Sequence, residues 1–156
     1  VAKLRNSIRA SHGRDVLAAT RHLWTGLVDA QDQPLPLDWL LGRTVIGACA
    51  IGNPHGFETA LADNLGDREP AAMFSLPDHD PFAPATVRRI VDAATSARAG
   101  AIVITDKDWS KLRALPATTW PCPVVRPILS LGFVSGREAL EAAVVQVLKP
   151  QREPRR

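Results

Sequence analysis

The sequence is poor in aromatic residues and contains no tyrosine. Its 156 residues include four tryptophans, four phenylalanines, one methionine and two cysteines. Proteins that bind single-stranded nucleic acid stack bases on aromatic side chains along a basic groove. The chain offers too few aromatic residues for such a platform, and we expect no nucleic-acid partner.

Long apolar runs are also missing. A membrane-spanning helix needs roughly 18 or more consecutive apolar residues, and no stretch of the sequence approaches that length. The start shows no signal-peptide pattern of basic, apolar and small residues. The chain begins at Val1 rather than with methionine, so we expect a processed product or a fragment of a longer protein.

The two cysteines and the uneven charge narrow the class of protein further. Cys49 and Cys122 lie in apolar segments, where cysteine behaves as a small buried hydrophobic residue rather than a disulfide or metal partner, as in a reducing compartment. The net charge of +3 comes from the two chain ends, and the stretch between them is net acidic. Basic ends are usually solvated, and we expect the tail at 150–156 to be disordered.

Strand and helix patterns alternate along the chain. Continuous apolar, β-branched runs are typical of strands buried on both faces, and alternation with helices indicates right-handed crossovers. We therefore predict a single three-layer α/β/α domain with a mostly parallel sheet. The expected strands are 44–51, 71–77, 101–105 and 123–131, with an extended piece at 16–22, and the expected helices are 3–10, 37–41, one starting at 54, 84–97, 109–115 and 135–148.

Polar clusters follow three of the expected strands, where an open parallel sheet binds its ligands. The first is the turn Gly52-Asn53-Pro54. Gly47 and Gly52 have the spacing of a Walker A loop, but Asn53 and Pro54 stand where its lysine and hydroxyl residue belong. The turn is therefore not a P-loop; it either presents helix N–H groups to an anion or, as we favour, simply caps a helix.

The second cluster places His79 between Asp78 and Asp80. Flanking carboxylates favour the charged form of a histidine, which could accept a proton or orient a group that does. A surface histidine in an Asp-rich turn is an equally good interpretation. A metal site made of these three residues is a weaker one, since adjacent residues rarely converge on one ion.

The third cluster is Thr105-Asp106-Lys107-Asp108. Lys107 could bind a phosphate as a point charge. Alternatively, an aspartate of this run caps the following helix while the lysine is solvated.

In their order, the segments IGNPHGF (51–57), LPDHDPF (76–82) and TDKDWSKL (105–112) resemble the carboxyl-terminal half of the tetraacyldisaccharide 4'-kinase (lipid A 4'-kinase) family. The sequence departs from the family pattern at four positions. Leu76 replaces an aromatic residue, Asp80 a histidine, Phe82 a tyrosine and Asp106 a glutamate, and only the last two changes keep the size or the charge.

The resemblance implies phosphoryl transfer from MgATP to the 4'-hydroxyl of tetraacyldisaccharide 1-phosphate, a lipid A precursor, at the cytoplasmic face of the inner membrane. It implies a catalytic role for His79, with Asp78 beside it, together with an aspartate of the amino-terminal domain. The candidates on the substrate or phosphate side are Asn53, Thr105, Asp106, Lys107 and Asp108.

The resemblance also implies a division of the chain and of the chemistry. Residues 1–36 would be an inter-domain linker or hinge, and 37–149 the carboxyl-terminal α/β domain of a two-domain kinase. The family's Walker A loop and magnesium carboxylates belong to the amino-terminal P-loop domain, so we expect no cofactor or metal site in this chain and no kinase activity from it alone.

Two other functions are consistent with the same residues. A regulatory or ligand-binding α/β domain would share this frame without catalysis. A metal-dependent phosphohydrolase would use Asp78, His79 and Asp80. A structural interaction module is weaker, because such modules need no polar clusters at three strand ends.

Overall fold

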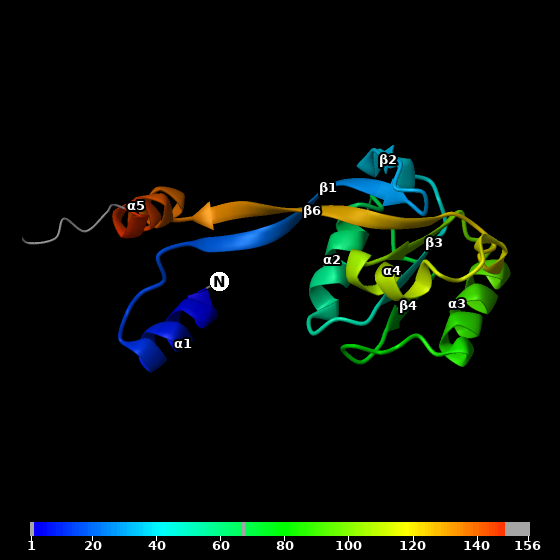
Figure 1. The fold of residues 1–156 in the computed structure, drawn as a ribbon, viewed down its shortest axis with the longest axis horizontal. Coiled ribbons are helices and arrows are strands. Elements are labelled where there is room, and N and C mark those ends of the chain that lie inside the picture. Colours follow the sequence, from blue (N-terminus) through cyan, green and yellow to red (C-terminus); the bar gives the residue numbers. More distant parts are fainter. Residues whose placement is uncertain (1, 67, 149–156) are drawn as a thin grey trace, which may run out of the picture. The chain divides into compact units, whose positions relative to one another are not determined.

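The computed structural model describes residues 2–66 and 68–148, which divide into two compact units. One unit runs from Trp24 to Ser130, and the other combines the described residues before Trp24 with those after Ser130 (Figure 1). The boundaries predicted at residues 36 and 149 stay predictions, and the expected tail at 150–156 lies outside the described residues.

The described strands form a six-stranded sheet in the order β2-β1-β6-β5-β3-β4. β3 pairs in parallel with β4 and β5, and β5 pairs in parallel with β6, whereas β2 is antiparallel to β1. The predicted α/β fold with a mostly parallel sheet is therefore confirmed. The strands are β1 (Ala19–Asp29), β2 (Pro34–Leu35), β3 (Val45–Cys49), β4 (Ala72–Ser75), β5 (Ala101–Ile104) and β6 (Val124–Ser135).

Helices connect the parallel strands, and side chains cap the starts of α2 and α4. The Asn53 side chain accepts a hydrogen bond from the Gly56 N–H, and Pro54 opens α2, as the sequence predicts. α4 begins at Asp106, ahead of the predicted start at Trp109, because the Thr105 hydroxyl caps it. The helical elements are α1 (Ala2–His12), η1 (Leu37–Leu40), α2 (Pro54–Asp63), α3 (Pro84–Ser96), α4 (Asp106–Leu112), η2 (Ala117–Thr119) and α5 (Arg137–Leu148).

Successive side chains of the central strands point to opposite faces of the sheet and are buried on both. The 24–130 unit therefore has two apolar cores. On β3, Ile46 and Ala48 belong to the core that α3 and α4 cover. Val45 and Cys49 of the same strand belong to the core that α2 and η1 cover. Burial on both faces explains the unbroken apolar run of β3, and the predicted three-layer arrangement holds within this unit.

The second unit contains α1, α5 and the outer parts of β1 and β6. α5 begins after Gly136, whose φ of +76° suits glycine, and an added Cβ there would clash with the Leu17 carbonyl. The described residues of α5 include no buried side chain, and Val147 and Leu148 are 84% and 75% exposed. The predicted helix is therefore present, but within the described part of the chain its apolar residues are at most partly covered.

Two strands differ from the sequence prediction in their extent. β1 starts at Ala19 and continues to Asp29, later than the expected extended piece at 16–22. β6 continues to Ser135 although its second half is exposed, because β1 is its neighbour in the sheet. No helix in the described residues has the length and apolar character needed to cross a membrane.

Candidate active site

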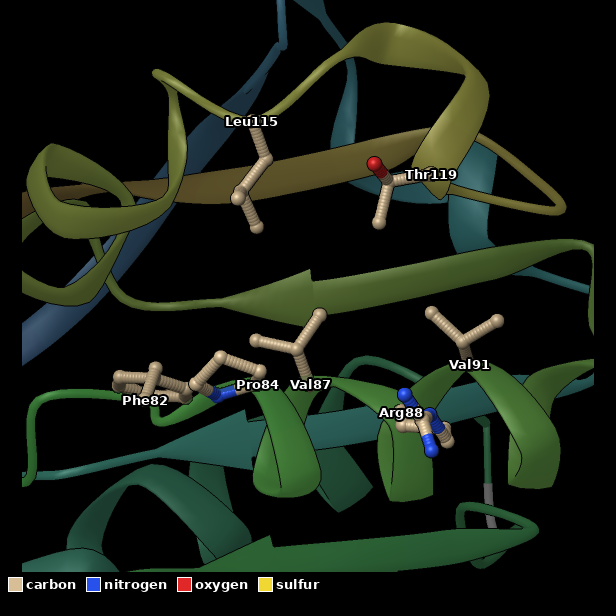
Figure 2. A pocket seen from close by; sticks show the side chains of 7 residues that line it. All are labelled: Phe82, Pro84, Val87, Arg88, Val91, Leu115 and Thr119. Atoms are coloured by element: carbon tan, nitrogen blue, oxygen red, sulfur yellow. The ribbon is translucent and has the colours of Figure 1, made fainter.

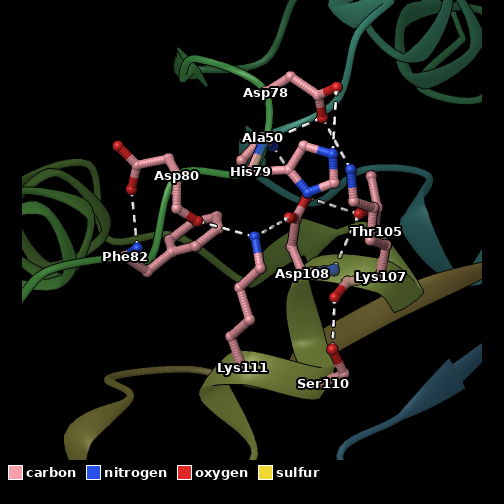
Figure 3. Close-up of polar contacts among 10 residues, drawn as sticks. All are labelled: Ala50, Asp78, His79, Asp80, Phe82, Thr105, Lys107, Asp108, Ser110 and Lys111. Atoms are coloured by element: carbon pink, nitrogen blue, oxygen red, sulfur yellow. Dashed lines mark hydrogen bonds and ion pairs between the residues drawn. The ribbon is translucent and has the colours of Figure 1, made fainter.

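The turns that follow β3, β4 and β5 meet at one edge of the sheet in the 24–130 unit (Figure 3). The His79 N–H donates to the Ala50 carbonyl across 3.4 Å, which joins the turn after β4 to the end of β3. The Ala50 N–H donates to Asp108 Oδ2 at 2.8 Å, which joins β3 to the turn after β5. The structure therefore brings together polar clusters that lie far apart in the sequence.

Asp78, His79 and Lys107 form the exposed part of this edge. Lys107 Nζ lies 2.7 Å from Asp78 Oδ1, and His79 Nε2 lies 3.6 Å from Asp78 Oδ2. The His79 side chain is 77% exposed, whereas those of Asp78 and Lys107 are 44% and 42% exposed. One carboxylate thus lies between an imidazole and an ammonium group, both open to a bound molecule.

Lys107 also changes the acidity of Asp78. The hydrogen bond from Lys107 is the largest cause that lowers the pKa of the Asp78 carboxyl, and the charges of His79 and Lys107 act in the same direction. Asp78 is therefore ionised at neutral pH. It can pair with a protonated imidazole, but it is a weak general acid.

Asp108 is the buried part of the same edge, with no exposed surface. Its Oδ2 accepts from the Thr105 hydroxyl at 2.6 Å in addition to the Ala50 N–H, and its Oδ1 lies 3.3 Å from Lys111 Nζ. A buried carboxylate is tolerated only when it is paired and hydrogen-bonded. Asp108 and Thr105 therefore fix the turn, and the predicted contact of these two residues with a substrate stays a prediction.

The turn 78–82 has an unusual backbone. His79 and Phe82 have φ values of +64° and +55°, in a region that side chains with a Cβ rarely adopt. Asp80 holds this shape, since its Oδ1 accepts from the Phe82 N–H at 2.7 Å and its carbonyl accepts from Lys111 Nζ at 2.7 Å. Strain of this kind is found at functional sites when the surroundings enforce it.

Two of the predicted site residues point their side chains elsewhere. Asn53 uses its side-chain oxygen to cap α2, although the adjacent Gly52 lies close enough that an added Cβ would be 3.5 Å from Asp78 Oδ2. Asp106 pairs with Arg126, whose Nη1 is 2.6 Å from its Oδ1. Gly47 is not in a phosphate loop: it lies within β3, beneath Met73 and Leu61.

Arg126 is a residue that the sequence analysis missed. It is 6% exposed, pairs with the exposed carboxylates of Asp32 and Asp106, and donates to the Asp29 carbonyl at 3.0 Å. Arg126 therefore connects the start of α4 to the β1–β2 connection. The sequence contains a signal for Arg126, since it is the only charged residue in the apolar run PVVRPILS. An arginine on a buried strand needs ion-pair or hydrogen-bond partners. Lys111 carries a weaker signal, three residues after Asp108 on the same helix.

The described residues contain no group of three or more histidine, cysteine, aspartate or glutamate side chains placed to hold a metal ion. Within the turn, Asp80 Oδ1 turns back to the Phe82 N–H instead of joining Asp78 and His79. This geometry gives no support to the metal-dependent phosphohydrolase that the sequence left open.

Comparison with protein families matches residues 4–148 to the family described as Tetraacyldisaccharide-1-P 4'-kinase, LpxK. No curated protein matches the chain. Among solved structures the chain is similar to the crystal structure of the "apo" form of LpxK from Aquifex aeolicus in complex with ATP, with 15% sequence identity and a TM-score of 0.47. That alignment covers 89% of this chain and 40% of the other, so the chain spans less than half of that protein's length.

Proposed function

The chain belongs to the tetraacyldisaccharide-1-P 4'-kinase family, and from this premise we propose that it is the carboxyl-terminal domain of an ATP-dependent lipid kinase. The reaction is phosphorylation of the 4'-hydroxyl of tetraacyldisaccharide 1-phosphate in lipid A biosynthesis. The family match over residues 4–148 carries the proposal. The meeting of the three strand-end turns supports it, because this edge is where an open parallel sheet binds its ligands.

His79 and Asp78 take the catalytic part in this proposal. Phosphoryl transfer depends on positioning, on charge neutralisation and on a group that orients or deprotonates the nucleophile. The exposed imidazole of His79 can contact the sugar hydroxyl directly, or through an aspartate of another domain. Asp78, 3.6 Å from its Nε2, is placed to pair with the imidazole when the ring is protonated. Lys107 keeps Asp78 ionised and offers a cation to a phosphate group of the substrate.

The segment from Gly47 to Pro54 is not built as a loop for the phosphates of ATP. An added Cβ on Gly47 would meet Met73 and Leu61, so side chains fill the space that a phosphate would need. Asn53 and Pro54 open α2 without a lysine for the terminal phosphates. We propose that an amino-terminal P-loop domain of the same protein holds ATP and Mg²⁺, and that residues 1–156 alone have no kinase activity.

The proposed partners follow from the same premise. They are the amino-terminal P-loop domain, the lipid A precursor and the inner-membrane surface, with the enzyme peripheral to the cytoplasmic face. No nucleic acid is among them.

The test is a phosphoryl-transfer assay on the complete reading frame that contains this chain, with MgATP and tetraacyldisaccharide 1-phosphate. His79→Ala should lower the rate about 100-fold or more, the scale of a lost acid–base participant. The matched control is His55→Ala, which removes an 87% exposed histidine from α2 of the same unit. Full activity in His79→Ala, or an equal loss in the control, would remove the role given to His79. Absence of transfer in the unmodified protein would overturn the proposed function.

A further inference from the structure

An apolar pocket of about 330 Å³ opens beside the candidate active site (Figure 2). It lies between the first turns of α3 and the chain segment that follows α4. Its volume falls at the lower end of the range for small-molecule sites, which are mostly apolar with a few polar groups. Its lining consists of Phe82, Pro84, Val87, Arg88, Val91, Leu115 and Thr119.

Phe82 belongs to both the pocket and the polar edge of the sheet. Its side chain lines the pocket, while Lys111 Nζ lies 5.5 Å from its ring centroid and its N–H is held by Asp80. Phe82 is 5% exposed and sits in the strained turn with His79. The apolar pocket therefore begins where the polar cluster ends, and one rigid side chain separates the two.

The rim of the pocket is suited to an amphiphile. Leu115 is 36% exposed, and an apolar ligand in the pocket would cover it. The exposed Arg88 forms no ion pair with any residue between 24 and 130 that the structure describes, and its guanidinium is available to an anion. A long side chain of this type places its apolar stem along the pocket and its charge in solvent.

We propose that this pocket binds one fatty acyl chain of the glycolipid substrate, while the phosphorylated sugar lies over the polar edge at His79 and Lys107. The identity of the ligand rests on the proposed function, since the substrate of that reaction carries both groups in one molecule. The order along the surface is polar cluster, Phe82, then apolar pocket with a cationic rim. This matches the order of headgroup and chain in an acylated sugar phosphate.

The test measures binding of octyl, decyl and dodecyl phosphate to residues 1–156, below the concentrations at which these probes form micelles. Titration calorimetry gives the affinity, and methyl NMR shifts of Val87, Val91 and Leu115 locate the probe. Each methylene that enters the pocket should strengthen binding about fourfold. An affinity independent of chain length, or shifts confined to other parts of the chain, would overturn the inference.

Two variants test the pocket itself. Leu115→Asp places a charge in its wall and should weaken dodecyl phosphate binding by about tenfold or more. Leu115→Trp narrows the space with an apolar side chain and should abolish the dependence on chain length. Leu41→Asp is the matched control, because Leu41 is a 54% exposed leucine of the same unit that lines no part of this pocket. Equal losses in Leu115→Asp and Leu41→Asp would overturn the inference.

This measurement involves no phosphoryl transfer, so it separates the inference from the proposed function. Chain-length-dependent binding that Leu115→Asp weakens would support the pocket even if the complete protein shows no kinase activity. Kinase activity without such binding would leave the proposed function standing and remove the acyl-chain site.

Discussion

Lys107 Nζ lies 2.7 Å from Asp78 Oδ1, although 29 residues separate the two in the sequence. The pair connects the turn after β4 to the start of α4, and it presents a fixed cation and anion at the edge where the candidate site lies. Both side chains are more than two-fifths exposed, so solvent screens their attraction. The pair therefore shapes the site more than it stabilises the fold.

We expect the Lys107→Met substitution to raise the pKa of Asp78, because it removes the hydrogen bond that is the largest cause lowering it. The lowered pKa means that ionised Asp78 stabilises the folded state above its unfolded pKa, and this contribution is lost as pH falls through the folded value. The measurement is an NMR pH titration of the Asp78 carboxyl carbon. Lys3→Met in the other unit is the control and should leave the titration unchanged. An unchanged titration in Lys107→Met would contradict the assignment.

The Asp108→Ala substitution should lower the free energy of unfolding by about 3–5 kcal/mol, the scale for breaking a buried pair. It removes the acceptor of the Ala50 N–H and the carboxylate that pairs with Lys111, whose ammonium group keeps only its bond to the Asp80 carbonyl. Urea unfolding measures the change. Asp92→Ala, on the exposed face of α3, is the control and should stay within about 0.5 kcal/mol of the unmodified protein. A loss as small as that of the control would show that Asp108 is not the buried link described above.

The Gly47→Ala substitution should destabilise the protein by about 1 kcal/mol or more. The added Cβ would overlap Met73 Sδ and approach Leu61 Cδ2 to 2.8 Å, so these two side chains must repack between β3 and α2. Gly100→Ala is the control, because its Cβ would meet Arg43 no closer than 3.4 Å. Thermal unfolding of both variants measures the difference. Equal stability of the two would contradict the packing role of Gly47.

Cys49 should resist alkylation in the folded protein. Burial raises the pKa of its thiol to about 11, so the reactive thiolate is scarce at pH 8. Because the folded-state pKa is raised, this group's contribution to stability is present below the ordinary value and is lost as the pH rises toward 11. Mass spectrometry after iodoacetamide treatment should find Cys122, which is partly exposed, modified first. Modification of Cys49 without unfolding would contradict the burial.

The sequence predicted the parts of the fold that local pattern dictates. The apolar run of β3 identified a strand covered on both faces, and Asn53 with Pro54 identified the start of α2. The meeting of the three strand-end turns followed from the parallel sheet alone, because parallel strands place their carboxyl ends at one edge.

Other features depend on residues that are distant in the sequence. Arg126 pairs with Asp32, which lies 94 positions away in the sequence, and no local pattern predicts that partner. The left-handed φ values of His79 and Phe82 are unfavourable for these residues, so propensity argues against them. Hydrogen bonds with distant residues, from His79 to Ala50 and from Lys111 to Asp80, help to hold them. The exposure of Val147 and Leu148 on α5 could not be predicted either, since an apolar pattern does not say whether a neighbour is present to cover it.

The hydrogen bond between the Ala50 amide and Asp108 determines whether the site can open by local unfolding. It is fully buried and spans 58 positions of the chain. A local fluctuation of either turn cannot break it without exposing a charge to the apolar core, so we expect the Ala50 amide proton to exchange with solvent only when the whole unit unfolds. This buried link is therefore lost only together with the fold of the unit, and a destabilising substitution far from the site should speed exchange of the Ala50 amide proton by the factor by which it raises the unfolded population.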